Sequence, residues 1–327
     1  MYIVTGGAGF IGSNVAAELS DRGSEIVVCD WMRNDERWRN LAKHEIADFV
    51  APTQLDGWLR VHGRHVSAII HMGAVSATTE TDVDLITSSN INLTLQLLRW
   101  CTETATRFIY ASSAATYGNG DAGFDDEFTR HSLAKLRPLN AYGWSKHVVD
   151  RRIARLAETT SPLPPQYAGL KFFNVYGPNE YHKAGMKSVI AQNFARVRSG
   201  EPLHLFRSYR SEYADGGQLR DFIYVRDCVD VIMWLLDHPE ISGLFNVGTG
   251  KARSWLDLGR ALFAAAGRPE AISFIDMPAP LIDKYQYFTE ARMGRLRDAG
   301  YSQPFTSLED GVADYVQRFL AGSDPYR

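Results

Sequence analysis

Tyr142 and Lys146 stand four residues apart at the start of a predicted helix over residues 141–157, so both side chains project from one helix face. A tyrosine can remove a proton from an alcohol, but its unperturbed pKa is about 10. A neighbouring ammonium would favour the phenolate and lower that pKa. The pair is therefore a candidate catalytic base with its tuning charge. The alternative is a surface tyrosine and lysine on an exposed helix.

The same spacing occurs a second time, at Tyr167 and Lys171. That pair runs from a loop into a predicted strand, where four residues cover about 13 Å, and we interpret it as a chance match. The first pair has a better context, because a predicted strand ends at Ser112 and Ser113 shortly before it. Active sites of parallel sheets gather at the carboxyl ends of strands, so Ser113 could hydrogen-bond a substrate hydroxyl there.

Three glycines, Gly6, Gly9 and Gly12, lie between a β-branched run and a predicted helix over residues 13–22. This strand–turn–helix suits a pyrophosphate, because helix N-termini carry unpaired N–H groups and partial positive charge. Asp30 ends the next apolar run, and its carboxylate can bind an adenosine ribose. The sequence therefore predicts a bound dinucleotide. A glycine-rich turn without a ligand is the alternative.

The composition is typical of a globular protein: of 327 residues, 45% are hydrophobic and 22% charged, and the formal net charge is −3. This charge gives no argument for binding nucleic acid, and no stretch reaches the roughly 20 apolar residues of a membrane span. Cys29, Cys101 and Cys228 are far apart and fit neither a disulfide framework nor a metal site. We expect no metal, no signal peptide before the first strand and a cytoplasmic location.

Strand and helix patterns alternate along the N-terminal half of the chain. Apolar strands are predicted near residues 26–29, 45–49, 68–71, 107–113 and 169–176, and a long helix over 82–102. Buried strands alternating with helices predict an α/β fold with a doubly wound parallel sheet of the Rossmann type. We expect a dinucleotide-binding domain from residues 1–177 and 222–269, and a smaller α/β substrate-binding domain from 178–221 and 270–327.

With these residues placed, the chain resembles the extended short-chain dehydrogenase/reductase family, whose sugar-nucleotide epimerases and dehydratases carry Thr-Gly-Gly-Ala-Gly-Phe-Ile-Gly almost verbatim. The resemblance covers nearly the whole chain. It includes His71-Met72-Gly73-Ala74, Asn90, Asn174-Val175-Tyr176-Gly177-Pro178, Arg220-Asp221-Phe222-Ile223-Tyr224-Val225 and Asn246-Val247-Gly248-Thr249-Gly250. Other segments are similar to the branch that inverts carbon 6 of an ADP-linked heptose for bacterial lipopolysaccharide: residues 76–80, 110–118, 182–183 and 284–290.

The resemblance implies a redox-neutral epimerisation with a small-molecule nucleotide sugar as substrate, catalysed by a homo-oligomer. Tyr142 would be the base, Lys146 would tune it and bind the nicotinamide ribose, and Ser113 would orient the sugar. Lys183 would be a second acid–base group on the opposite side. The implied cofactor-binding residues are Gly6, Gly9, Phe10, Ile11, Gly12, Asp30, Trp31, Arg37, Asp48, Met72, Gly73, Ala74, Ser76, Asn90 and Lys146. The implied substrate-binding residues are Ser113, Asn174, Lys183, Phe206, Arg220 and Tyr285.

The choice between NADP and NAD depends on a few residues after the second strand. Asp30 alone favours NAD, because a carboxylate repels a 2′-phosphate, whereas Arg33 and Arg37 could bind that phosphate. The branch resemblance favours NADP, with NAD possible. Trp31 and Met72 depart from the residues usual in the branch, which puts the details of the cofactor contact in doubt.

Other functions stay open. One is a 4-epimerase or 4,6-dehydratase for another nucleotide sugar, although dehydratases place an acid pair where this chain has Ala114 and Ala115. Another is a non-catalytic NAD(P)-binding regulator, which would not need the serine, tyrosine and lysine together. Lys183 could be a solvated surface lysine, and Arg220 could form a structural ion pair with Asp221. Residues 207–218 look longer than the comparable segment of better-known members, and their role stays open.

Overall fold

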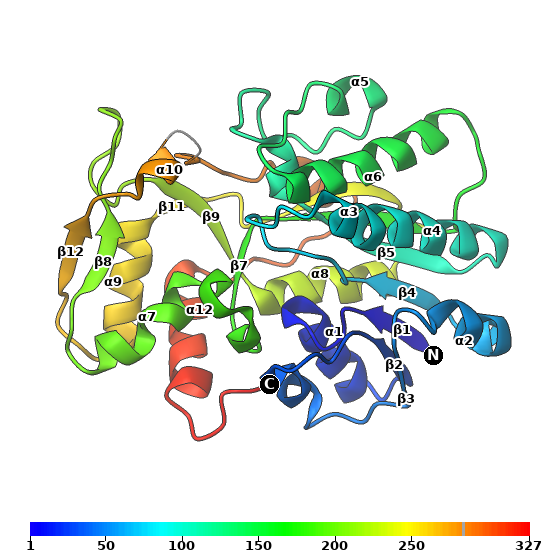
Figure 1. The fold of residues 1–327 in the computed structure, drawn as a ribbon, viewed down its shortest axis with the longest axis horizontal. Helices are drawn as coiled ribbons and strands as arrows, with labels where there is room; N and C mark the ends of the chain where they lie inside the picture. The colour runs from blue at the N-terminus through cyan, green and yellow to red at the C-terminus, as the bar shows by residue number, and fades with distance from the viewer. Residues whose placement is uncertain (283–284) are drawn as a thin grey trace.

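The computed structural model describes residues 1–282 and 285–327, and its central feature is a seven-stranded sheet (Figure 1). The strand order is β10-β6-β5-β4-β1-β2-β3, and every neighbouring pair is parallel. The strands are β1 (Tyr2–Thr5), β2 (Ile26–Cys29), β3 (Asp48–Val50), β4 (Ala68–His71), β5 (Arg107–Ser113), β6 (Tyr167–Phe172) and β10 (Gly243–Val247). The predicted doubly wound parallel sheet is confirmed.

Alternate residues of each central strand belong to two separate hydrophobic cores, because successive side chains of a strand point to opposite faces. Val4 lies in the core shared with α1 (Phe10–Asp21) and α8 (Val225–Asp237). Ile3 lies in the core shared with α2 (Leu55–His62), α4 (Leu93–Glu103) and α6 (Ala141–Glu158). Figure 1 shows α4 and α6 on one side of the sheet and α1 on the other, so both faces are covered.

The helix predicted over residues 82–102 is a continuous helical run with an irregular middle. It consists of α3 (Val83–Ile86), a π-helical turn η3 (Thr87–Asn92) and α4. The carboxylate of Asp82 caps its start by accepting a hydrogen bond from the Leu85 amide at 2.9 Å. π-Helical turns are frequent at functional sites, and this one carries Asn90.

A smaller domain is built around a separate hydrophobic core of its own (Figure 1). It contains a three-stranded sheet with the order β11-β9-β7 and a parallel pair, β12 and β8, that the sequence did not predict. The strands are β7 (Asn174–Tyr176), β8 (Leu203–Phe206), β9 (Leu219–Tyr224), β11 (Ala252–Ser254) and β12 (Ile272–Ile275). The helices of this core are α7 (Val189–Arg198), α9 (Trp255–Ala265) and α12 (Leu308–Asp314).

The packing differs from the domain boundaries drawn from the sequence in several places. Strands β7 and β11 and most of β9 lie in the sheet of the smaller domain, whereas Leu296 and Tyr301 lie in the core of the large sheet. Strand β10 and helix α8 return to the large sheet and its core, but α9 packs with α7 and α12 in the smaller domain. We therefore propose that residues 255–265 belong to the substrate-binding domain. The physical reason is that Leu258 and Leu262 of α9 complete the core that β8 begins with Leu203 and Leu205.

Short helical segments complete the described chain: η1 (Glu36–Leu41), η2 (Gly63–His65), η4 (Ala114–Tyr117), α5 (Arg130–Leu133), η5 (Tyr181–Met186), α10 (Ala279–Ile282), α11 (Gly294–Asp298) and η6 (Tyr315–Leu320). Within residues 1–282 and 285–327, no helix has the length and apolar character that crossing a membrane requires.

Candidate active site

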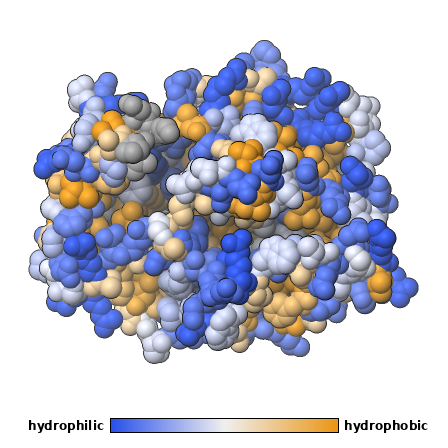
Figure 2. All heavy atoms as spheres, in the orientation of Figure 1, coloured by the Kyte–Doolittle hydropathy of each residue, from blue (hydrophilic) through white to orange (hydrophobic). Residues whose placement is uncertain are grey.

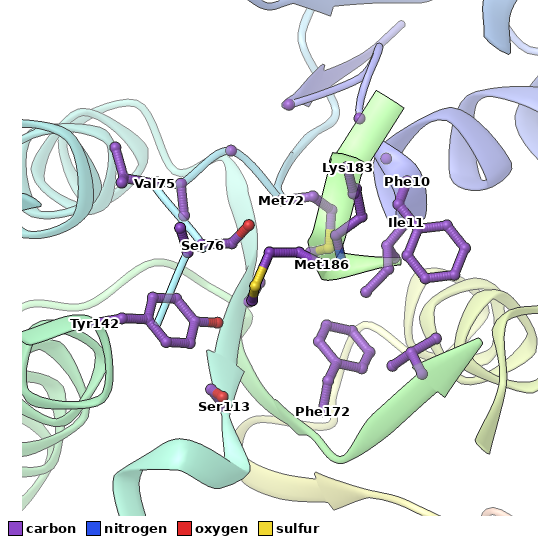
Figure 3. Close-up of a pocket in the computed structure, with 18 of the residues that line it drawn as sticks. Phe10, Ile11, Met72, Val75, Ser76, Ser113, Tyr142, Phe172, Lys183 and Met186 are labelled. Carbon is purple, nitrogen blue, oxygen red and sulfur yellow. The ribbon is translucent and has the colours of Figure 1, made fainter. Parts of the chain in front are cut away.

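A cavity of about 510 Å³ opens at the carboxyl ends of the parallel strands. Figure 2 shows the face of the molecule on which the surface is hollowed between the two domains, and Figure 3 shows the side chains inside the cavity. The predicted site residues that line it are Gly6, Gly9, Phe10, Ile11, Gly12, Asp30, Arg37, Met72, Gly73, Ala74, Ser76, Ser113, Tyr142, Lys146 and Lys183. The predicted residues outside this lining are Trp31, Asp48, Asn90, Asn174, Phe206, Arg220 and Tyr285.

The glycine loop at the start of α1 leaves room that side chains would fill. Gly6 has a φ of +64°, in the left-handed region that favours glycine, and its carbonyl oxygen accepts a hydrogen bond from the Gly9 amide at 2.9 Å. A Cβ at Gly12 would collide with the same carbonyl oxygen, so only glycine lets α1 approach the loop this closely. The first residues of α1 thus line the cavity, and a helix N-terminus at this place fits the pyrophosphate of a dinucleotide.

Asp30 directly follows β2, and hydrogen bonds from the backbone hold its carboxylate beside the glycine loop. Its carboxylate accepts hydrogen bonds from the amides of Ala8 at 2.9 Å and Trp31 at 2.7 Å, while burial raises its pKa. The guanidinium of Arg37 lies 3.8 Å from Asp30 and forms hydrogen bonds of 2.8 and 2.7 Å with Asp35. Arg33 also lines the cavity. This end of the cavity therefore offers both a carboxylate and two guanidinium groups to an adenosine ribose.

Ser113 and Tyr142 meet across the cavity floor from two different elements. Ser113 ends β5, and Tyr142 lies in the first turn of α6, whose start is capped by Asn140 accepting from the Gly143 amide at 2.8 Å. The Ser113 hydroxyl favours the ionised form of the Tyr142 phenol, and Figure 3 shows the Tyr142 hydroxyl pointing into the cavity. Glycine at 143 permits this approach, because a Cβ there would lie 2.6 Å from the Ala115 carbonyl oxygen of η4.

The electrostatics of this pair differ from the sequence-based prediction. We predicted that Lys146 would lower the pKa of Tyr142, but burial raises that pKa, against the opposing effect of the Ser113 hydroxyl. Burial also lowers the pKa of Lys146 to about 8, because the ammonium is almost fully removed from water. The spacing identified two residues that line one cavity, but desolvation, which it does not encode, decides the direction of both pKa shifts.

Lys183 lies on the opposite side of the cavity from Tyr142 (Figure 3). Its ammonium is 5.3 Å from the ring centroid of Phe10, and burial lowers its pKa against the effect of Glu180. It is therefore not a solvated surface lysine. The next residue, Ala184, has a φ of +47°, which is uncommon for a residue with a side chain.

His182 lines the cavity beside Lys183 and was not among the predicted site residues. Burial lowers its pKa to about 4, so the imidazole is neutral, and one ring nitrogen lies 3.4 Å from the Asn40 amide nitrogen. His182 could have been identified from the sequence because it directly precedes Lys183. Phe172 and Phe173 also line the cavity, and the rule that parallel strands end at the site could have found them.

Asn90 holds a wall of the cavity without lining it. Its side chain accepts from the Val75 amide at 2.8 Å and donates to the Val75 carbonyl at 3.0 Å and to the Ser145 hydroxyl at 3.0 Å. This buried amide thus fixes the loop after β4 to helix α6. We therefore predict that Asn90 does not contact the cofactor directly but shapes its site by holding this loop.

Two other predicted cofactor residues face elsewhere. The carboxylate of Asp48 accepts a hydrogen bond from the indole of Trp58 at 2.7 Å, outside the cavity. The structure thus gives no support to a cofactor contact for Asp48, which begins β3, because parallel strands present the site at their opposite ends. Trp31 follows Asp30 but is 48% exposed and also lies outside the lining.

The remaining predicted substrate residues form a second group in the smaller domain, here called the Arg220 cluster: Phe206, Arg220, Trp255 and Tyr285. The Arg220 guanidinium lies 5.2 Å from the Tyr285 ring centroid and 6.0 Å from that of Trp255, and Phe206 is 6.4 Å from Tyr285. Asn174, at the start of β7, is exposed and lies outside the cavity lining. Lys284, which begins the segment 284–290, lies outside the described residues.

Arg220 is buried without a carboxylate partner among the described residues. Its side chain donates to the carbonyl oxygens of Leu219, at 2.8 Å, and of Gln286, and burial lowers its pKa. The alternative of an ion pair with Asp221 is wrong. The Asp221 carboxylate instead accepts hydrogen bonds from backbone amides, among them that of Thr249 at 2.7 Å. A desolvated guanidinium without a counter-ion is a typical anion-binding group.

No group of three or more histidine, cysteine, aspartate or glutamate side chains gathers in a metal-binding arrangement in the part of the chain that the structure describes. The three cysteines are buried, and burial raises the pKa of Cys29 to about 12. These thiols are therefore protonated core side chains at neutral pH.

Residues 2–248 match the NAD dependent epimerase/dehydratase family. A relative from Nitratidesulfovibrio vulgaris, named ADP-L-glycero-D-manno-heptose-6-epimerase, is 51% identical over 331 residues, which cover 100% of both chains. The crystal structure of the ADP-L-glycero-D-manno-heptose-6-epimerase of Helicobacter pylori is similar with a TM-score of 0.79 at 28% identity, over 97% of this chain and 95% of that one. The UDP-glucose 4-epimerase of Thermus thermophilus in complex with NAD gives a TM-score of 0.72 at 25% identity, over 95% and 96%.

Proposed function

The chain belongs to the NAD dependent epimerase/dehydratase family, and from this premise we propose that it inverts carbon 6 of an ADP-linked glycero-manno-heptose, a precursor of bacterial lipopolysaccharide. The family membership confirms the resemblance found in the sequence and makes the protein a nucleotide-sugar epimerase. The name of the relative that is 51% identical over the full length supports the choice of an ADP-heptose as substrate.

The observation that carries the proposed mechanism is that Tyr142 and Lys183 face each other across one cavity (Figure 3). The hydride leaves one face of carbon 6 and returns to the other, and in each half-reaction the substrate oxygen exchanges a proton with a group within about 3 Å. A nicotinamide dinucleotide, when bound, would take a hydride from carbon 6 and return it to the other face. Two half-buried acid–base groups on opposite walls fit this reaction.

On one face, Tyr142 would remove the proton from the substrate hydroxyl. The Ser113 hydroxyl, which lines the same cavity, would contact the substrate oxygen and hold it next to the phenol. Lys146 would bind the nicotinamide ribose from the next turn of α6, and its positive charge would favour the phenolate. On the other face, Lys183 would act as the second acid–base group.

The cofactor proposed for this cavity is NADP. The family is NAD-dependent, and Asp30 together with the glycine loop suits either dinucleotide. Arg33 and Arg37 favour NADP, because their guanidinium groups would bind a 2′-phosphate at the cavity end next to Asp30. The Arg220 cluster would bind the substrate, with Arg220 on its diphosphate and the aromatic rings around its nucleotide.

The test is an epimerisation assay with purified ADP-D-glycero-D-manno-heptose and catalytic amounts of NADP. We expect its conversion to the L-glycero epimer, separated by chromatography, and the same equilibrium ratio when the reaction starts from the product. UDP-glucose serves as the control substrate in a parallel reaction. Conversion of UDP-glucose without conversion of the heptose would contradict the proposed substrate, and inactivity toward both would favour the non-catalytic alternative.

A further inference from the structure

A buried ion pair joins α6, the helix that carries Tyr142 and Lys146, to strand β6. Asp150 follows Lys146 by one turn of α6 and Tyr142 by two, so the three residues share a helix face. Its carboxylate lies 3.4 Å from the ammonium of Lys171 on β6, and both side chains are fully shielded from solvent. Lys171 belongs to the second Tyr–Lys spacing of the sequence, the one interpreted as a chance match.

The pair connects the elements that carry the proposed acid–base groups. The Asp150 carboxylate accepts hydrogen bonds from the hydroxyl of Ser112 at 2.7 Å and from that of Tyr110 at 3.1 Å, both on β5. Ser112 is the direct neighbour of Ser113. The Lys171 ammonium donates to the Thr116 hydroxyl of η4 at 2.6 Å. Helix α6, strands β5 and β6 and the turn η4 therefore meet at this one pair.

A buried ion pair is a poor means of gaining stability. Removing both charges from water costs several kcal/mol, and well-packed apolar side chains at the same places are often as stable or more so. What a fully hydrogen-bonded pair does provide is fixed geometry, since each oxygen and each N–H must keep its partner. A site that transfers protons over about 3 Å requires such geometry.

We propose that the Asp150–Lys171 pair positions the acid–base groups of this enzyme: it holds Ser113 of β5 against Tyr142 of α6, and its carboxylate is the counter-charge for Lys146. This inference rests on the proposed function, because it assigns Tyr142, Ser113 and Lys146 their roles in that reaction. Asp150 and Lys171 touch neither the cavity nor the substrate, so both act through their neighbours.

The charge of Asp150 favours the protonated form of both Tyr142 and Lys146. Its removal is therefore expected to lower the pKa of both groups. The other groups that face these residues are His71 of β4, which burial keeps neutral by lowering its pKa to about 3, and, around Lys171, the ring of Tyr117 and the carboxylate of Asp126. His147 of α6 also faces Lys171, and its pKa is lowered to about 4.

The experiment compares Asp150→Asn with the double variant Asp150→Asn/Lys171→Met, which is neutral like the wild-type pair. For both we expect kcat to fall by up to about 100-fold with little change in KM, because a misplacement of about 1 Å at the chemistry has that effect. A substrate-free readout is the phenolate absorbance of the cofactor-free protein against pH, with Tyr142→Phe subtracted. Without Asp150, the ionisation of Tyr142 is expected to move to lower pH.

Asp227→Asn is the matched control, because Asp227 is a buried carboxylate of α8 that accepts hydrogen bonds from Thr306 and lies outside the cavity lining. The proposal is supported if the double variant regains the thermal stability of the wild type while kcat stays low and the Tyr142 ionisation stays shifted. It is wrong if that variant regains wild-type kcat without a shift, or if neither variant folds. Wild-type inactivity on the heptose would contradict the proposed function, whereas the absorbance titration would still test the pair.

Discussion

The cavity and the Arg220 cluster each bury a cation, and they surround it differently. Lys146 is 3% exposed and has the carboxylate of Asp150 one helical turn away. Arg220 is 6% exposed, and its partners within the described residues are carbonyl oxygens and aromatic rings. Burial lowers the pKa of Lys146 to about 8, within the range where the ammonium can lose its proton. A guanidinium keeps its proton at any physiological pH.

The different surroundings of Lys146 and Arg220 suit different roles, proton transfer for the first group and substrate binding for the second. A group that supports proton transfer needs a pKa near the working pH, which burial and a nearby carboxylate together provide. A group that binds a diphosphate needs a permanent positive charge that no internal anion neutralises. Mutations in the cavity are therefore expected to change turnover, and mutations in the Arg220 cluster are expected to change substrate affinity.

The largest effect is expected for Tyr142→Phe. The phenyl ring keeps the packing, but the substrate hydroxyl loses its base, so kcat for epimer conversion should fall by about 10²- to 10⁴-fold. Initial rates at saturating substrate measure this, and cofactor binding, measured by fluorescence titration, should stay unchanged. Turnover close to that of the wild type would mean that another group is the base.

Lys183→Met removes the group on the opposite wall of the cavity and should lower kcat by about 10²-fold, if each face of the carbon needs its own proton partner. Lys187→Met removes the same charge just after η5 and outside the cavity lining, and serves as its control. The rates of the two variants are compared in both directions of the reaction. Equal rates for both variants would show that a single acid–base group is sufficient.

Arg220→Gln tests the binding side of the comparison. Loss of charged hydrogen bonds to a diphosphate, at about 1.5–3 kcal/mol, should raise KM by about 10- to 150-fold with a smaller change in kcat. Isothermal titration with ADP measures the same loss without turnover. Arg226→Gln, at an exposed arginine of α8, is the control. A fall in kcat at unchanged KM would place Arg220 with the catalytic groups and remove the distinction drawn here.

The smallest effect is expected for Arg37→Gln, which concerns the cofactor end of the cavity. Removing this guanidinium should weaken the binding of NADP by about tenfold and leave that of NAD nearly unchanged, because only NADP carries the 2′-phosphate. The dissociation constants of both dinucleotides measure this preference, with Arg39→Gln, an exposed neighbour, as the control. Equal losses for both would show that Arg37 acts through Asp30 and not through the phosphate.

Much of the cavity was predictable because it is built from local patterns at strand ends. The glycine loop and Asp30 each follow a buried strand, Ser113 ends one, and a parallel sheet brings such ends to one edge. Asp48 was predicted at the same edge, but it begins its strand instead of ending it. The smaller domain was less predictable, since β8 and β12 pair across many residues of intervening chain.

The sequence by itself determined the sheet, the dinucleotide loop and the spacing of Tyr142 and Lys146, because these depend on backbone conformation and periodicity within short segments. The tertiary structure alone decided the burial of those groups and the partners of Lys171 and Arg220. The spacing of Tyr167 and Lys171 is identical to that of Tyr142 and Lys146. Yet Tyr142 and Lys146 line the cavity, whereas Tyr167 and Lys171 lie outside its lining. Desolvation and charge pairing depend on every element packed around a side chain, and therefore the direction of a pKa shift cannot be derived from the neighbours along the chain.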